Sequence, residues 1–171
     1  VVMQLNYFNK PYFGNGDISK ISKVLTLNGI EKPLVCSDPG LSSIGMIDKI
    51  KDLISDEFSA SFYEDTPANP TENSVNDALN IYRNNGCDGV VGFGGGSSMD
   101  LAKAVSLMAN HDGNIIDYSV VEGGYRKITK TIPMIAIPTT SGTGSEVSDG
   151  ALLVMNDGRK LIFASPHLRP N

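Results

Sequence analysis

The chain has 171 residues, and 14 Lys and Arg against 19 Asp and Glu give a formal net charge of −5 at pH 7. A length within about 100–200 residues predicts one domain. Hydrophobic, charged and aromatic fractions of 40%, 19% and 7% are those of a globular protein, which excludes disordered, collagen-like and coiled-coil chains. The acidic balance, with a pI of about 4.9, lacks the basic patch that nucleic-acid binding requires.

No apolar run reaches the roughly 20 residues that a membrane helix needs, and residues 1–10 lack the charged-then-apolar pattern of a signal peptide. Cys36 and Cys87 stand inside apolar runs without CxxC spacing, which is typical of buried thiols in a reducing compartment. The sequence therefore favours a cytoplasmic protein with neither a membrane nor a nucleic acid as partner.

Short apolar runs alternate with amphipathic stretches, which predicts an α/β fold: βα units around a mainly parallel sheet with helices on both faces. The predicted strands are residues 1–8, 33–37, 58–63, 89–93 and 132–137. The predicted helices are residues 18–27, 45–54, a segment from the turn at 68–71 through Tyr82, and residues 97–108. The last of these helices is apolar on nearly every face, so we expect it to be central. Residues 151–163 predict a hairpin, and residues 166–171 are typical of a linker.

The predicted strand 89–93 leads directly into Gly94-Gly95-Gly96-Ser97 (the glycine loop) and a helix. Three residues without Cβ let backbone N–H groups approach a ligand closely, and the positive end of a helix dipole favours an anion. We expect Ser97 to cap the helix, with Asp100 in the capping-box position. The loop predicts a pyrophosphate site, although a tight strand-to-helix turn also uses glycine.

Asp38 follows the predicted strand 33–37, where a carboxylate can accept hydrogen bonds from an adenosine ribose. A free 2′-hydroxyl suits this carboxylate and a 2′-phosphate would be repelled, so NAD is favoured over NADP. The alternative is a structural turn at Asp38-Pro39-Gly40 that ends the strand. The local sequence does not separate the two.

The predicted strand 132–137 ends in residues 138–146 (the hydroxyl loop), which hold Thr139, Thr140, Ser141, Gly142 and Thr143. Hydroxyl groups donate and accept, so they suit ribose, phosphate or carboxamide, although many surface loops have this composition. Ligands of open parallel sheets bind outside the carboxyl ends of the strands. We therefore expect both loops to open onto one crevice.

Other catalytic patterns are missing from the sequence. The only histidines, His111 and His167, belong to no cluster with the spacing of a zinc or iron site. Neither a Gly-x-Ser-x-Gly elbow nor a Walker loop occurs. The chain is predicted to bind a cofactor without holding a complete catalytic centre or a metal.

Together these segments resemble the iron-containing (metal-dependent) alcohol dehydrogenases over nearly the whole chain. The resemblance is carried by Phe13-Gly14-Asn15-Gly16, the strand ending at Asp38, Asn69-Pro70-Thr71, Gly94 to Asp100 with Ala102-Lys103, and Ile137 to Glu146. It implies a Rossmann-like nucleotide-binding domain similar to that of dehydroquinate synthase. It also implies an NAD(P)-dependent oxidoreductase that moves a hydride between an alcohol or aldehyde and nicotinamide.

The resemblance implies roles for individual residues as well. Asp38 would set the preference for NAD, Asn69 would contact the adenosine side, and the glycine loop would cradle the pyrophosphate. The threonines of the hydroxyl loop would line the nicotinamide-ribose end, and Lys160 would reach a ribose. The candidate cofactor-binding residues are Asp38, Asn69, Gly94, Gly95, Gly96, Ser97, Asp100, Thr139, Thr140, Gly142, Thr143 and Lys160.

In that family one Asp and three His hold iron or zinc in a helical C-terminal domain, after a segment like residues 164–170. Residues 1–171 are therefore expected to be the NAD(P)-binding domain, with Fe²⁺ or Zn²⁺ only in the full-length protein. The metal lowers the pKa of the alcohol, so this chain alone is expected to be inactive.

Two alternatives stay open at this point. The first is a polyol dehydrogenase of the glycerol dehydrogenase type, and the second is a non-catalytic nucleotide-binding module. Half of an enzyme would expose the apolar surface meant for its other half, so a homo-oligomer is a further hypothesis.

Overall fold

The computed structural model describes residues 11–54 and 56–171, so the predicted strand at residues 1–8 lies outside the described residues. Four strands form one parallel sheet in the order β2-β1-β3-β4, which confirms the predicted α/β class. A separate antiparallel hairpin lies where residues 151–163 predict one. The strands are β1 (Pro33–Cys36), β2 (Ser61–Tyr63), β3 (Gly89–Gly94), β4 (Met134–Pro138), β5 (Gly150–Val154) and β6 (Lys160–Ala164).

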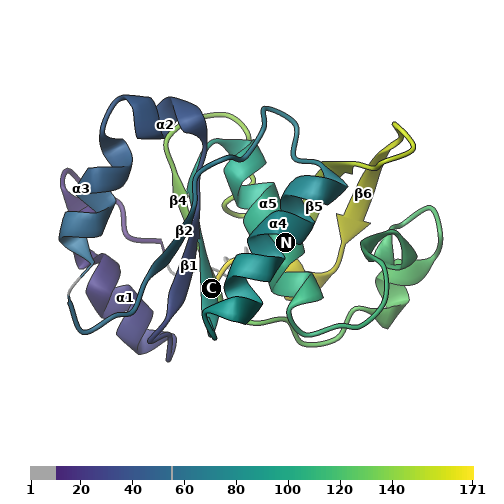
Figure 1. Cartoon of the computed structure of the whole chain (residues 1–171), viewed down its shortest axis with the longest axis horizontal. Coiled ribbons are helices and arrows are strands. Elements are labelled where there is room, and N and C mark those ends of the chain that lie inside the picture. Colours follow the sequence, from purple (N-terminus) through teal and green to yellow (C-terminus); the bar gives the residue numbers. More distant parts are fainter. Residues whose placement is uncertain (1–10, 55) are drawn as a thin grey trace, which may run out of the picture.

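Helices cover both faces of the sheet (Figure 1). α1 (Ile21–Leu27) and α3 (Met46–Leu53) lie on one face, and α4 (Glu72–Asn84) and α5 (Gly96–Met108) lie on the other. The hairpin lies beyond α5, so α5 is enclosed between the sheet and the hairpin. Ten of its 13 residues are therefore buried, and the predicted central helix is confirmed.

The sheet separates two apolar cores, because successive side chains of a strand point to opposite faces. Val35 and Val91 pack with α1 and α3, whereas their neighbours Leu34 and Val90 pack with α4 and α5. With both faces covered, β1 and β3 are apolar at nearly every position, as parallel strands usually are. No helix among the described residues is long and apolar enough to cross a membrane.

Two segments differ from the sequence expectation. The residues after Asp38 form a short helix, α2 (Pro39–Ser43), rather than only a turn; Pro39 fits there because the first helical position needs no N–H donor. Residues 166–171 are packed rather than linker-like. Leu168 is buried, and Asn171 exchanges two hydrogen bonds with the Met134 backbone at 2.8 and 3.0 Å.

Short 3₁₀ helices complete the fold. One of them leads into α1, so the predicted helix at residues 18–27 is split into a 3₁₀ turn and an α-helix. Two occupy the connection between α5 and β4, for which the sequence predicts no element. Their bounds are Asp17–Lys20, Ile115–Tyr118, Gly124–Lys127 and Pro166–Leu168.

Cys36 and Cys87 are buried and carry no disulfide, as the sequence predicts. Burial raises the pKa of both thiols, so the thiolate form is disfavoured in each. These two cysteines are therefore part of the packing rather than reactive groups.

α5 packs closely on the sheet at Gly92 of β3. A Cβ at this position would lie 3.0 Å from Met99 Cα and 3.1 Å from both Ala102 Cβ and Met134 Cε. The missing side chain therefore fixes how deeply α5 packs onto β3, and with it the position of the first turn of the helix.

We predict that Gly92→Ala lowers the free energy of unfolding by about 1–3 kcal/mol, because the added methyl group overpacks this contact. Gly150→Ala is the matched control, since its Cβ would make only an ordinary contact at 3.6 Å with Phe163 O. Gly→Ala lowers the conformational entropy of the unfolded chain equally in both variants. The difference between their free energies of unfolding therefore reports the packing at Gly92. Urea denaturation measures it, and equal midpoints would contradict the prediction.

Candidate functional site

The glycine loop and the hydroxyl loop lie at the same edge of the sheet, as the sequence predicts. β3 and β4 are parallel neighbours in which Gly94 pairs with Pro138. Thr139 N donates a hydrogen bond to Gly94 O at 2.9 Å, so the two chains are still paired where the loops begin. The two loops therefore form one continuous surface at the carboxyl ends of the strands.

Two of the three consecutive glycines are required by the chain itself. Gly94 has φ +151°, and a Cβ there would clash with Ser98 Oγ and lie 3.1 Å from Asp38 Oδ2. A Cβ at Gly96 would lie 3.2 Å from the Thr143 side chain. Gly94 therefore serves a tight backbone path, and Gly96 lets the hydroxyl loop pack against the glycine loop.

Gly95 is different, because nothing in the described part of the chain requires glycine there. Its φ of −78° and ψ of −173° are open to other residues. An added Cβ would meet only Thr140, at 3.4 and 3.8 Å, which are ordinary contacts. Packing within the chain therefore does not explain why position 95 has no side chain. A ligand that approaches the backbone closely would explain it.

The expected cap of α5 is wrong. The helix begins at Gly96 with Gly95 as its N-cap, and no side chain caps it. Ser97 Oγ instead donates to Ala68 O at 2.5 Å. The Asp100 carboxylate accepts hydrogen bonds from Ser145 Oγ at 2.6 Å and from Leu152 N of β5 at 3.0 Å.

α5 begins without a side-chain cap, as α1 and α3 do, whereas α2 and α4, which begin beside the glycine loop, are capped. Asp38 caps α2 and Thr71 caps α4, in each case through a side-chain oxygen. The first-turn N–H groups of an α-helix need an acceptor from outside the helix, and they carry the positive end of its dipole. The start of α5 therefore suits an anion such as a phosphate.

Asp38 is a structural residue, as the turn alternative expects, and it keeps one carboxylate oxygen toward the glycine loop. Its Oδ1 accepts from Leu41 N at 3.1 Å, which makes it the cap of α2. Its Oδ2 lies 3.5 Å from Ser98 Oγ, beside the backbone of Gly94. One oxygen is structural, and the other faces the glycine loop.

Asn69 and Lys160 close the site on the side of the hairpin. Lys160 Nζ, at the start of β6, donates to Asn69 Oδ1 at 2.9 Å. Ala68, the neighbour of Asn69, is bonded to Ser97, so the turn before α4 joins the glycine loop to the hairpin. The structure thus brings together predicted residues that lie up to 91 positions apart in the sequence.

The hydroxyl loop presents its candidate residues on the surface. Thr139, Thr140 and Thr143 are exposed, with Thr140 next to Gly95 and Thr143 next to Gly96. Gly142 has φ +100°, so it provides the turn between them. Of these threonines, Thr140 borders the open space at Gly95.

Lys103 is named in the sequence analysis only as part of the family resemblance and is not among the candidate cofactor-binding residues. It is fully buried in α5, and its Nζ donates to Ser145 Oγ at 3.2 Å, Ser148 O at 3.0 Å, Ser148 Oγ at 2.9 Å and Gly150 O at 2.8 Å. Burial lowers its pKa from the usual 10.5 to about 8, and the nearby carboxylates of Asp100, Asp149 and Glu146 act in the opposite direction. The one basic residue in a helix that is apolar on nearly every face was the signal that could have found it.

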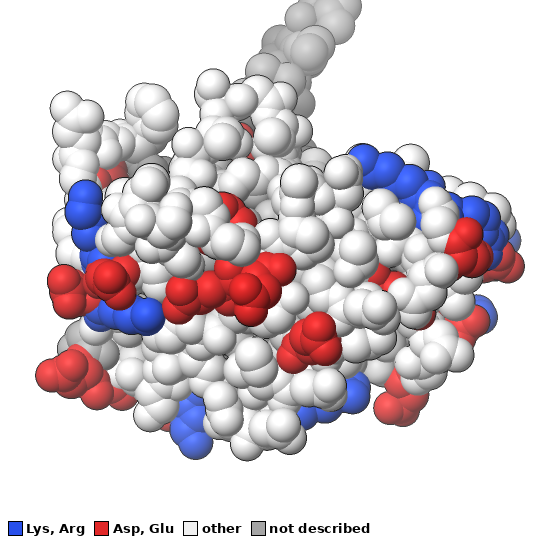
Figure 2. All heavy atoms as spheres, turned by 45° about the horizontal axis from the view of Figure 1, so that its top comes forward, with Lys and Arg blue, Asp and Glu red and all other residues white. Residues whose placement is uncertain are grey.

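Charge does not gather at this edge as a basic patch. Figure 2 turns the upper side of Figure 1 toward the viewer, and there Asp and Glu atoms occupy the middle of the face while most Lys and Arg atoms lie toward its margins. An anion bound here would therefore depend on backbone N–H groups and the α5 dipole. Within residues 11–54 and 56–171, no group of three His, Cys, Asp or Glu could hold a metal ion.

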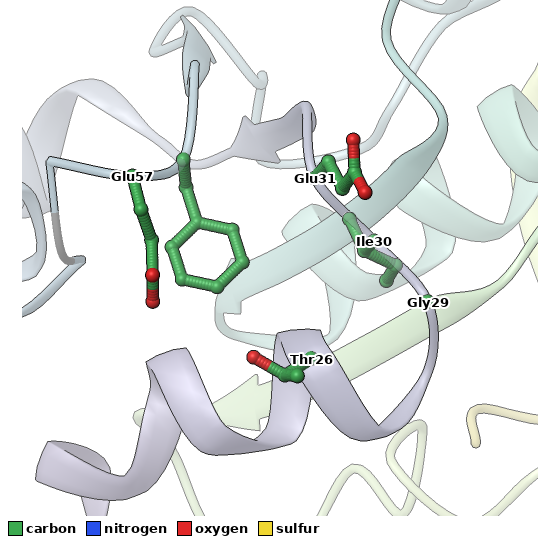
Figure 3. Close-up of a pocket in the computed structure, with 6 residues that line it drawn as sticks. Thr26, Gly29, Ile30, Glu31 and Glu57 are labelled. Carbon is green, nitrogen blue, oxygen red and sulfur yellow. The ribbon is translucent and has the colours of Figure 1, made fainter.

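A separate shallow hollow of about 260 Å³ lies at the opposite edge of the sheet, between the end of α1 and the start of β1. Figure 3 shows Thr26 on one side of it and Glu31 and Glu57 on the other. It is smaller than the roughly 300–1,000 Å³ of typical ligand pockets and has carboxylates on its rim. It lies far from both loops, so we do not assign it to the site.

The comparisons with known families and relatives agree over nearly the whole chain. A sequence profile of the family described as iron-containing alcohol dehydrogenase matches residues 9–171. A 4-hydroxybutyrate dehydrogenase of Cupriavidus necator is 42% identical over 165 residues, which cover 96% of this chain and 43% of the relative. Alcohol dehydrogenase 4 of Schizosaccharomyces pombe is 36% identical, covering 92% and 37%. The chain thus spans less than half the length of these curated relatives.

Solved structures share the fold. The chain is similar to an NADH-dependent butanol dehydrogenase A of Thermotoga maritima, with a TM-score of 0.89 and 28% identity over 99% of this chain and 42% of that one. It is also similar to a sulfoacetaldehyde reductase of Bifidobacterium kashiwanohense in complex with NAD⁺, with a TM-score of 0.85 and 30% identity over 99% and 45%.

The lowered pKa of Lys103 predicts how the free energy of unfolding depends on pH. Its pKa is about 8 in the folded chain and near 10.5 when unfolded, so between these values the unfolded state holds one more proton. The contribution of this residue to the free energy of unfolding is therefore absent below pH 8 and rises by about 3 kcal/mol up to pH 10.5. Urea denaturation at several pH values should show this rise in the wild type relative to Lys103→Met. A constant difference between the two proteins would contradict the prediction.

Proposed function

Because the chain belongs to the iron-containing alcohol dehydrogenase family, we propose that it binds a nicotinamide dinucleotide for the interconversion of an alcohol and an aldehyde. The observation that carries the proposal is Gly95, where backbone and packing permit a side chain and none is present, directly at the uncapped start of α5. A bound NAD supplies the nicotinamide C4 that accepts the hydride of the alcohol.

The pyrophosphate would lie over the glycine loop. The open space at Gly95 allows close approach, and the first-turn N–H groups of α5 donate to phosphate oxygens. Gly94 and Gly96 shape this surface, and Ser97 holds it to the turn before α4. The fit to a diphosphate rests on backbone donors, in keeping with the lack of a basic patch on this face.

The adenosine ribose would lie beside Asp38. The Oδ2 of this carboxylate faces the glycine loop and can accept a hydrogen bond from a ribose hydroxyl, whereas it repels a 2′-phosphate. Asn69 would contact the adenosine side across the glycine loop. NAD is therefore the proposed cofactor, and NADP is the less favoured one.

The nicotinamide-ribose end would lie along the hydroxyl loop. Thr139, Thr140 and Thr143 present donors and acceptors there. Gly142 makes the turn between them without adding a side chain. Lys160 stands at the start of β6 and would donate to a ribose hydroxyl in addition to Asn69. Asp100 holds the hydroxyl loop by accepting a hydrogen bond from Ser145 Oγ.

The described residues do not fit a metal ion, so we derive no step through iron or zinc. What they do fit is the binding and orientation of the dinucleotide. Relatives carry names as different as 4-hydroxybutyrate, choline and methanol dehydrogenase, and we propose 4-hydroxybutyrate as the first alcohol to assay because its dehydrogenase is 42% identical.

Binding of NADH, measured by calorimetry or by its fluorescence enhancement, tests the proposal at Gly95. Gly95→Ala should weaken binding about tenfold or more and Gly95→Val should abolish it, because a Cβ enters the space next to the backbone donors. Both variants should fold, since Gly95 has an ordinary backbone conformation. Undiminished binding by folded Gly95→Val would remove the glycine loop from the cofactor site.

Asp38→Gly should narrow the preference for NADH over NADPH by about tenfold or more, since the repelling charge is gone. Asp38→Asn is the matched control, because Asn caps a helix as well as Asp and carries no charge. Both variants should therefore shift the ratio of the two dissociation constants alike. A shift in Asp38→Gly alone would trace the effect to the lost cap of α2, contrary to the prediction.

A further inference from the structure

Lys103 is an internal anchor for the segment that follows the hydroxyl threonines. Its ammonium group contacts four oxygen atoms, all from Ser145, Ser148 and Gly150, at 2.8–3.2 Å. Every one of these contacts joins α5 to the stretch that runs from the hydroxyl loop into β5.

The contacts continue from Lys103 to the glycine loop through Ser145. Ser145 Oγ accepts from Lys103 and donates to Asp100 Oδ1 at 2.6 Å, so its orientation is fixed. Ser145 N donates to Thr143 Oγ1 at 3.4 Å. The Thr143 side chain in turn lies against Gly96, where an added Cβ would be 3.2 Å away.

This arrangement depends on the protonated form of Lys103. An ammonium group has three N–H donors for its four oxygen partners, whereas a neutral amine has two donors and a lone pair that would face an oxygen. The charged groups around it are Asp100 on α5, Glu146 in the hydroxyl loop and Asp149 before β5, which pairs with Arg169 at 3.3 Å. Loss of the proton therefore removes a donor and weakens the anchor.

We propose that Lys103 is a positioning residue for cofactor binding: its ammonium form, through Ser145, holds Thr143 of the hydroxyl loop against the glycine loop. The proposal deepens the proposed function and rests on it. Lys103 itself is buried beneath the site and touches no ligand.

The pH dependence of NADH binding is the test. Lys103 titrates near pH 8, and both thiols are moved above their usual range by burial, so they do not titrate with it. The dissociation constant of the wild type should rise about tenfold from pH 7 to about 9.5, the effect of losing one charged hydrogen bond. Lys103→Met should bind weakly at every pH, and Lys103→Arg should bind tightly at every pH, because arginine stays protonated.

Lys49→Met is the matched control, because Lys49 is an exposed lysine of α3 and its loss changes the net charge equally. It should follow the wild-type curve. The contribution of Lys103 to stability rises over the same pH range, so its deprotonation would not weaken binding by unfolding the protein.

The outcomes separate the two proposals. If the wild type binds NADH equally well from pH 7 to about 9.5, or if Lys103→Met follows the wild-type curve, the positioning role is overturned while the proposed function stands. If the wild type does not bind NADH at pH 7, the proposed function fails and this inference fails with it. Should Lys103→Met not fold, the wild-type and Lys103→Arg curves still decide.

Discussion

The parallel pairing of β3 with β4 determines most of this site. Parallel neighbours need a crossover connection, so the chain that leaves β3 must run back along one face of the sheet before β4 begins. Here that crossover begins with α5 directly at the carboxyl end of β3, and β4 ends level with it, with Gly94 opposite Pro138. One pairing therefore places a helix start, the glycine loop and the hydroxyl loop at the same edge.

α5 has to combine an open start with a stable position. A helix with a glycine N-cap in place of Ser, Thr, Asn or Asp is less stable by roughly a few tenths of a kcal/mol. α5 offsets this through burial, because it is enclosed between the sheet and the hairpin and comes close to β3 at Gly92. The backbone donors at its start can thus stay available to a ligand while packing holds the helix in place.

The same enclosure explains Lys103. A charge inside a protein is unfavourable unless it is surrounded by polar partners. The partners of Lys103 come from residues 145–150, which are distant in sequence and reach α5 only because the hairpin packs on it. The buried charge and the ordered hydroxyl loop therefore depend on each other, and both depend on the position of α5.

By itself, the sequence determined the parallel sheet, the central helix, the hairpin and the meeting of two strand-end loops, because hydrophobic periodicity and glycine placement are local properties. Only the tertiary structure decided the details that depend on distant groups. Asp38 acts as a cap through one oxygen and faces the glycine loop with the other, Asp100 and Ser97 turn to Ser145 and Ala68 instead of capping α5, and Lys103 finds its acceptors across the fold. A polar side chain bonds to whichever partner the packing brings nearest, and no local pattern in the sequence contains that distance.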